Sequence, residues 1–187
     1  MQLHEVLRRA FTDTAAVVHG VAPEQLGLPT PCADWDVRAL TNHLLQVAAA
    51  LSRAGQRLPV PAELWGQDLM TADGPGDRFD DDRRSALEAW SEPSAWDGTI
   101  NLGGMAMPAR MTVSMLVSDL AIHGWDLAQA TGQPYACDPA VAAVTREFMA
   151  GSAARGREMG IYAAARPVAD GADAFEEALA LSGRARP

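Results

Sequence analysis

Helical spacing of apolar residues is the feature that most constrains the fold of this chain. In five segments the apolar residues return every three or four positions, as they do along one face of an α-helix. We expect helices over about residues 2–19, 36–55, 77–91, 112–131 and 139–153. Proline and glycine gather between these segments, where helices end. The pattern predicts an all-α bundle, with a weaker helix near 173–182.

One stretch between the third and fourth predicted helices has a different pattern. Two short runs, Ile100–Leu102 and Met105–Met107, flank Gly103-Gly104. A Gly-Gly pair between short alternating runs is typical of a tight β-hairpin. We therefore expect a small hairpin here. Its exposed edge offers one route to a homodimer.

Composition and charge narrow the class of protein. The 187 residues are 48% hydrophobic, which is enough for a sizeable core. The formal net charge of −9 repels phosphate backbones, so we expect no nucleic-acid partner. The sequence has no apolar run long enough to span a membrane. Two distant cysteines and the absence of a secretory leader pattern favour a cytoplasmic protein.

Three residues with metal-binding side chains interrupt the apolar stripes. His43 follows Leu40 by three positions and precedes Val47 by four, so it shares their face of the second predicted helix. Asp119 and His123 are four positions apart on the apolar stripe of the fourth. Burial of a carboxylate beside imidazoles is costly unless its charge is compensated.

Two explanations of this pattern are open. The first is an internal Asp–His ion pair with a second histidine nearby. The second is a divalent cation bound by His43, Asp119 and His123, because helical bundles build metal sites from facing helices in this way. Two imidazoles and one carboxylate suit Zn, with Ni and Fe(II) as alternatives, and leave coordination positions open for water or substrate.

Residues beside these ligands have open roles. Asp126 follows His123 by three positions, and it either accepts the second ring proton of the imidazole or pairs at the surface. Asn42 and Gln46 are expected to be exposed rather than to line a pocket. Cys32 is expected to be a small packing residue rather than a catalytic thiol.

Two segments carry a resemblance to a known family. Residues 29–43, PTPCADWDVRALTNH, resemble the opening signature of the mycothiol-dependent maleylpyruvate isomerase N-terminal family, within the DinB-like superfamily. Residues 118–128, SDLAIHGWDLA, resemble its second signature. The resemblance implies an up-down-down-up four-helix bundle with a long crossover between the second and third helices. It also implies metal ligands at His43, Asp119 and His123.

The expected organisation is a single metal-binding domain over residues 1–187. Its bundle core covers 1–153, and a C-terminal appendage covers 154–187. The isomerase itself has a long second domain after the bundle, and it has glutamate where this chain has Asp119. The resemblance therefore implies a related reaction rather than the isomerase's own.

The implied function is that of a metal-dependent thiol transferase or isomerase. Its cofactor would be a divalent metal, its cosubstrate mycothiol and its substrate a small electrophile. Three alternatives stay open at this point: a non-catalytic bundle with a structural metal, a metal-dependent hydrolase of small molecules, and a metal-free interaction bundle.

Overall fold

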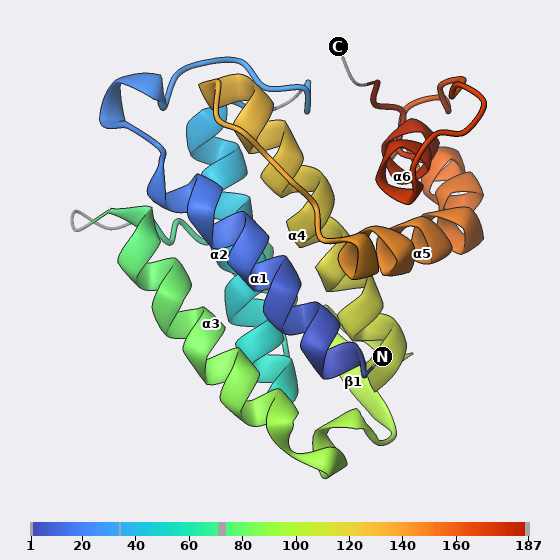
Figure 1. Ribbon diagram of the computed structural model, residues 1–187. Coiled ribbons are helices and arrows are strands. Elements are labelled where there is room, and N and C mark those ends of the chain that lie inside the picture. The colour runs from blue at the N-terminus through green and yellow to red at the C-terminus, as the bar shows by residue number, and fades with distance from the viewer. Residues whose placement is uncertain (1, 34, 71–73, 186–187) are drawn as a thin grey trace.

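Four helices form a bundle in a computed structural model that describes residues 2–33, 35–70 and 74–185 (Figure 1). They are α1 (Leu3–His19), α2 (Val37–Gly55), α3 (Pro75–Ser91) and α4 (Ala109–Thr131). Both α1 and α2 pack against α3 and α4. In the view of Figure 1 the chain runs up α1, down α2 and α3, and up α4. The predicted all-α, up-down-down-up bundle is confirmed.

Two further helices complete the chain on one side of the bundle. Helix α5 (Pro139–Glu158) packs against α4 and α1, and α6 (Ala174–Leu181) packs against α5. Figure 1 shows α6 beside α5, away from α3. Short 3-10 helices lie in the connections: η1 (Pro23–Gln25), η2 (Ala62–Gly66) and η3 (Pro93–Trp96).

The predicted hairpin is present. Strands β1 (Thr99–Leu102) and β2 (Met105–Pro108) are antiparallel, with Leu102 opposite Met105. Gly103 and Gly104 join them with positive φ angles of 58° and 90°. A two-residue turn with positive φ at both positions matches the twist of the strands, and glycine adopts it without steric cost.

The long crossover between α2 and α3 passes close to this hairpin. Val60 forms a parallel bridge with Leu102 on the side of β1 that β2 leaves open. Its N–H donates to the carbonyl of Asn101 at 3.1 Å, and its own carbonyl accepts from Gly103 at 2.8 Å. The start of the crossover is therefore hydrogen-bonded to the hairpin, and η2, which follows Val60, packs against α2.

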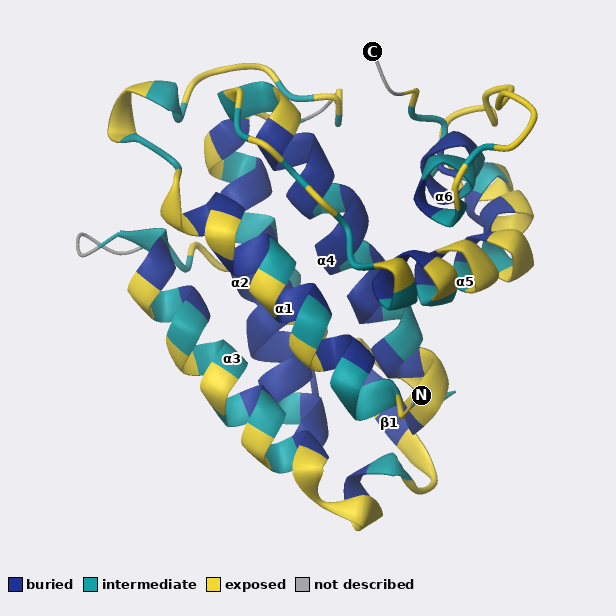
Figure 2. Ribbon diagram, viewed as in Figure 1, coloured by how far each residue is buried: buried dark blue, intermediate teal, exposed yellow. Residues whose placement is uncertain are grey.

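The core lies between α1, α2, α3 and α4, where the buried residues face one another (Figure 2). Phe11 of α1 and Phe79 of α3 meet edge to face, with ring centroids 5.7 Å apart. Trp90 is fully buried, and its indole N–H donates to the carbonyl of Leu51 at 2.9 Å. Large aromatic side chains of α1 and α3 thus fill part of the core, and Trp90 joins α3 to α2.

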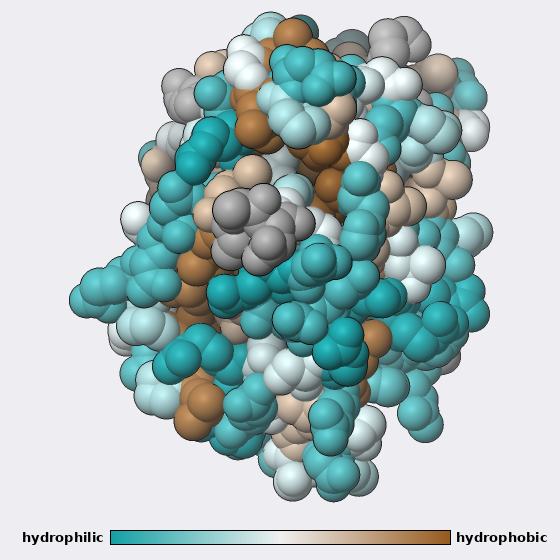
Figure 3. Space-filling view, turned by 90° about the vertical axis from the view of Figure 1, so that its left-hand side faces the viewer, coloured by the Kyte–Doolittle hydropathy of each residue, from teal (hydrophilic) through white to brown (hydrophobic). Residues whose placement is uncertain are grey.

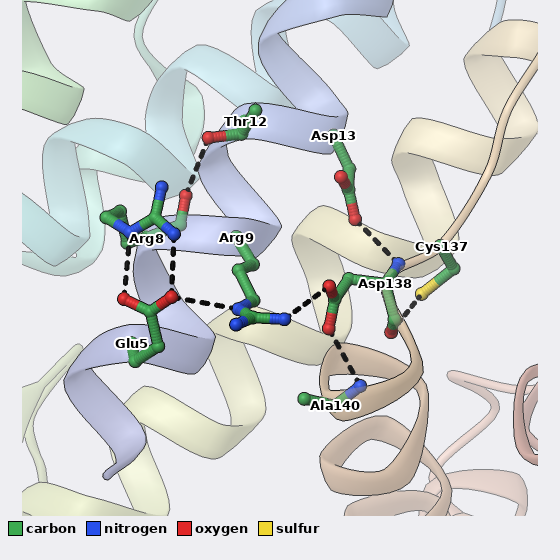
Figure 4. A network of polar contacts seen from close by, with 8 residues as sticks. All are labelled: Glu5, Arg8, Arg9, Thr12, Asp13, Cys137, Asp138 and Ala140. Carbon is green, nitrogen blue, oxygen red and sulfur yellow. Dashed lines mark hydrogen bonds and ion pairs between the residues drawn. The ribbon is translucent and has the colours of Figure 1, made fainter. Parts of the chain in front are cut away.

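Polar contacts join α5 to α1 (Figure 4). The Asp138 carboxylate accepts from the backbone N–H of Ala140 at 2.8 Å, which caps the start of α5. It also pairs with Arg9 at 2.7 Å, and the N–H of Asp138 donates to Asp13 at 2.9 Å. The first turn of α5 is therefore tied to the middle of α1.

One face of the molecule is largely polar. Figure 3 shows that the face carrying α3 is mostly hydrophilic, with hydrophobic side chains in small groups between polar ones. None of the helices in the described part of the chain combines the length and the apolar character needed to cross a bilayer.

Candidate functional site

Two imidazoles meet between α2 and α4. The ring centroids of His43 and His123 are 5.0 Å apart, and the rings are almost perpendicular at 86°. Helix α2 begins just before His43 because Asp36 accepts the N–H of Ala39 at 2.8 Å and so caps its first turn. The helical phase predicted from the sequence thus brings His43 and His123 together.

A tryptophan covers both rings. The Trp35 ring centroid is 4.6 Å from that of His43 and 5.4 Å from that of His123. Trp65, in η2 of the crossover, approaches His43 from another direction at 6.0 Å. These aromatic rings limit the access of water to the imidazoles.

Burial controls the protonation of His43. Removal from water, with a further contribution from the nearby His123, lowers the pKa of His43 to about 3, and Gln46 opposes this shift. His43 is therefore a neutral imidazole at neutral pH. A neutral ring offers a lone pair, which is the form that binds a metal.

Asp119 lies on the same helix as His123, one turn earlier. Burial raises the pKa of the Asp119 carboxyl, while His123 and Arg184 act in the opposite direction. By exposed surface, residue 119 is partly rather than fully buried. A cation bound beside this partly desolvated carboxyl would favour its charged form.

Asp126 contacts His123 directly. Its Oδ2 is 3.0 Å from Nδ1 of His123, and the side chain is fully buried. Of the two roles left open by the sequence, pairing at the surface is wrong, because Asp126 lies inside the molecule. Contact with the second ring nitrogen of a candidate ligand is the arrangement seen.

The C-terminal tail adds two residues that sequence reasoning missed. Arg184 forms two contacts with Asp126, Nε to Oδ1 at 2.7 Å and Nη2 to Oδ2 at 2.6 Å. Burial raises the pKa of Tyr162 to about 12, with the charge of Asp119 adding to the shift and that of Arg184 opposing it. No periodic pattern in the tail pointed to either residue.

A pocket of about 260 Å³ opens on the His43 side of this cluster, between α2 and the crossover. Asn42 and Gln46 line it, which corrects the expectation that both are simply exposed. The Asn42 side chain donates to the carbonyl of Gln67 and accepts from Leu69, and Gln46 donates to Gln67 at 2.7 Å. The crossover lies over α2, so these amides hold it in place.

The donor set of two imidazoles and a carboxyl fits a divalent ion in chemistry. The positions of the three side chains fit a metal site less well than their chemistry does. Among residues 2–33, 35–70 and 74–185, no group of three or more His, Cys, Asp or Glu side chains is arranged to hold a metal as they stand. The metal set of His43, Asp119 and His123 therefore remains a prediction.

Comparison with known proteins identifies the family. Residues 7–128 match the mycothiol maleylpyruvate isomerase N-terminal domain. Two uncharacterized proteins from Mycobacterium tuberculosis strains, CDC 1551 / Oshkosh and ATCC 25618 / H37Rv, are each 29% identical to the chain. The match spans 143 residues, which is 76% of this chain and 72% of each relative.

Solved structures share the fold. The crystal structure of the mycothiol-dependent maleylpyruvate isomerase aligns with a TM-score of 0.55 and 16% identity, over 83% of this chain and 73% of that one. A histidine-to-alanine mutant of that enzyme aligns over the same shares, with a TM-score of 0.58 and 15% identity. From the match over 7–128, the chain belongs to the mycothiol maleylpyruvate isomerase N-terminal domain family.

Proposed function

We propose that this protein is a metal-dependent enzyme that uses a low-molecular-weight thiol, mycothiol, to transform a small electrophile. In this proposal His43, Asp119 and His123 bind a divalent metal, with Zn the first candidate and Ni or Fe(II) the alternatives. The observation that carries it is the meeting of His43 and His123 from facing helices, with ring centroids 5.0 Å apart, and Asp119 lies one helical turn before His123 on α4. A bound cation would favour the charged form of that partly desolvated carboxyl.

The surroundings of the three residues support an open site rather than a structural one. Structural zinc sites are normally closed by four protein ligands, whereas catalytic sites keep one position for water or substrate. Here the proposed set has three ligands. The adjoining pocket of about 260 Å³ is below the usual volume for drug-sized ligands, so it suits a small electrophile or the thiol arm of a larger molecule.

The proposed roles follow from the geometry of the chain. When bound, the metal would act as a Lewis acid that lowers the pKa of a coordinated thiol, so that the thiol is a nucleophile at neutral pH. His43 is neutral and offers its lone pair. Asp126 holds the ring of His123 through Nδ1, and Trp35 shields both imidazoles. The amides of Asn42 and Gln46 shape the pocket wall.

Metal content is the first test. Protein purified without a metal-affinity tag should contain about one equivalent of a divalent metal by elemental analysis, and His43→Ala should lose most of it. The matched control is His19→Ala, because His19 lies elsewhere and contacts Asp80 at 2.9 Å. Metal below a tenth of an equivalent in the wild type, with cobalt binding unaffected by His43→Ala, would overturn the metal site.

Thiol binding is the second test. The Co(II)-substituted protein should develop a sulfur-to-cobalt charge-transfer band when it is titrated with mycothiol, and the His123→Ala variant should not. An unchanged spectrum would instead indicate a structural metal, above all if chelation unfolds the protein. Turnover is then measured with maleylpyruvate and with other small electrophiles, each with mycothiol present or omitted. Conversion that needs no thiol would replace the proposal by a metal-dependent hydrolase.

A further inference from the structure

We infer that Arg184, in the C-terminal tail, is a positioning residue that acts through Asp126 to fix the ring of His123. In this arrangement the guanidinium holds the carboxylate and the carboxylate holds the imidazole. The inference rests on the proposed function in one respect only: it takes His123 as a ligand. The contacts themselves involve protein atoms alone, so they can be tested in protein stripped of metal.

Arg184, Asp126 and His123 form a chain of successive contacts. Two nitrogens of Arg184 donate to the two oxygens of Asp126, at 2.7 Å and 2.6 Å. This is the bidentate contact typical of an arginine–carboxylate pair. Oδ2 of Asp126 also lies 3.0 Å from Nδ1 of His123. The side chains of Arg184, Asp126 and His123 are only 12%, 0% and 14% exposed. Such short contacts away from water leave Asp126 little freedom to turn.

These contacts select one tautomer of His123. A carboxylate paired with a guanidinium can only accept hydrogen bonds, so Nδ1 of His123 must carry the hydrogen that lies between them. In the neutral imidazole, Nε2 then holds the lone pair. A histidine held in this way offers a metal one defined nitrogen in one orientation, which is how carboxylates behind metal-binding histidines act.

The backbone of the tail places the guanidinium of Arg184 next to α4. Helix α6 ends at Leu181, and Gly183 follows with a positive φ of 87°. A side chain there would also meet Ala163, since an added Cβ would lie 2.7 Å from that residue's Cβ. The N–H of Arg184 donates to the carbonyl of Leu179 at 2.9 Å. The glycine turn thus directs the chain so that Arg184 reaches α4, and it lies beyond the residues that match the family.

The test compares Arg184→Met and Arg184→Lys with a control from the same tail, Arg166→Met. Arg166 is exposed, and its side chain donates to the carbonyl of Gly183 at 3.3 Å. The first readout is the tautomer of His123 in metal-free protein at pH 8, from nitrogen NMR of the ring, with the signal assigned from a His123→Gln variant. The second readout is cobalt affinity by chelator competition.

The wild type and Arg166→Met should show His123 with hydrogen on Nδ1. Arg184→Met should give a mixture of tautomers and bind cobalt about tenfold more weakly, at the lower end of what such partners contribute. Arg184→Lys should lie between the two, because lysine keeps the charge but not the two-pronged contact.

Each alternative outcome decides the inference. A folded Arg184→Met protein with the wild-type tautomer would overturn it. If that variant did not fold, wild-type tautomer and cobalt affinity in Arg184→Lys would overturn it instead. A wild type that bound no cobalt would overturn the proposed function. A tautomer shift in Arg184→Met would still support the positioning role of Arg184.

Discussion

Two pairs of aspartate and arginine connect distant parts of this chain, and they differ in their surroundings. Asp126 of α4 meets Arg184 at 2.6 Å, and Asp138 at the start of α5 meets Arg9 at 2.7 Å. The first pair is buried, with 0% and 12% of the two side chains exposed. The second is open to water, with 21% and 37% exposed.

Each aspartate also accepts a hydrogen bond from its own helix. Asp126 holds the ring of His123, whereas Asp138 holds the backbone N–H of Ala140. The same chemistry therefore orients a side chain in one place and starts a helix in the other. The buried pair is largely removed from water, so the loss of one partner leaves an uncompensated charge. At the exposed pair, water takes the place of a lost partner.

The largest effect is expected from Asp126→Ala. The variant leaves the guanidinium of Arg184 buried without its carboxylate, and breaking a buried pair in this way costs about 3–5 kcal/mol of unfolding free energy. Urea unfolding followed by circular dichroism measures it, with Asp138→Ala as the matched control. Equal losses in the two variants would contradict the comparison, since the exposed site should lose far less.

Removal of both partners of the buried pair should be less harmful than removal of Asp126 alone. The double variant Asp126→Ala with Arg184→Met leaves no unpaired charge, and contacting residues in such cycles couple by about 0.5–3 kcal/mol. We expect the double variant to be more stable than Asp126→Ala by an amount in this range. Urea unfolding of the four proteins of the cycle measures the coupling, and strictly additive losses would refute it.

Much of the fold could be predicted from local patterns. The helical spacing placed α1, α2 and α4 close to their observed bounds, and Gly103-Gly104 indicated the hairpin, because helix and turn formation depend on nearby residues. The same helical phase brings His43 and His123 together. Metal binding by these residues stays a prediction, since phase fixes the face of a helix but not the convergence of three side chains.

The rest of the site depends on contacts between distant segments. Arg184 reaches Asp126 from beyond the helix predicted near 173–182, which is present as α6, and nothing local indicates that contact. Asn42 and Gln46 looked exposed because a polar residue on a helix usually faces water. They bind the crossover instead, and the path of the crossover is set by its bridge to β1.

A smaller effect is expected at the start of α5. Asp138→Ala removes the cap that accepts from Ala140, and the loss of such a cap costs about 1 kcal/mol. Hydrogen exchange should show faster opening in the first turn of α5, with little change in α4. The control is Asp36→Ala, which removes the equivalent cap of α2 and should expose α2 instead. Exchange that rises equally throughout the bundle would argue against a local role for Asp138.

The smallest effect is expected from the charge of Asp138 alone. Partial desolvation raises the pKa of this carboxyl, but the N–H of Ala140 and the guanidinium of Arg9 lower it by more. The pKa in the folded protein therefore lies below the ordinary 3.8. Its charge then contributes stability above about pH 4, and this contribution is lost as the pH falls through the lower folded value. Asp138→Asn keeps an acceptor for Ala140 but removes the charge.

The difference in urea midpoint between wild type and Asp138→Asn should therefore be small at pH 7 and should close as the pH is lowered from 5 to 2. It should also shrink in 0.5 M NaCl, because salt screens an exposed pair. The matched measurement on Arg184→Met should keep most of its deficit in the same salt, since screening hardly reaches a buried pair. A deficit at Asp138→Asn that resisted salt, or that grew on acidification, would remove the distinction between the two pairs.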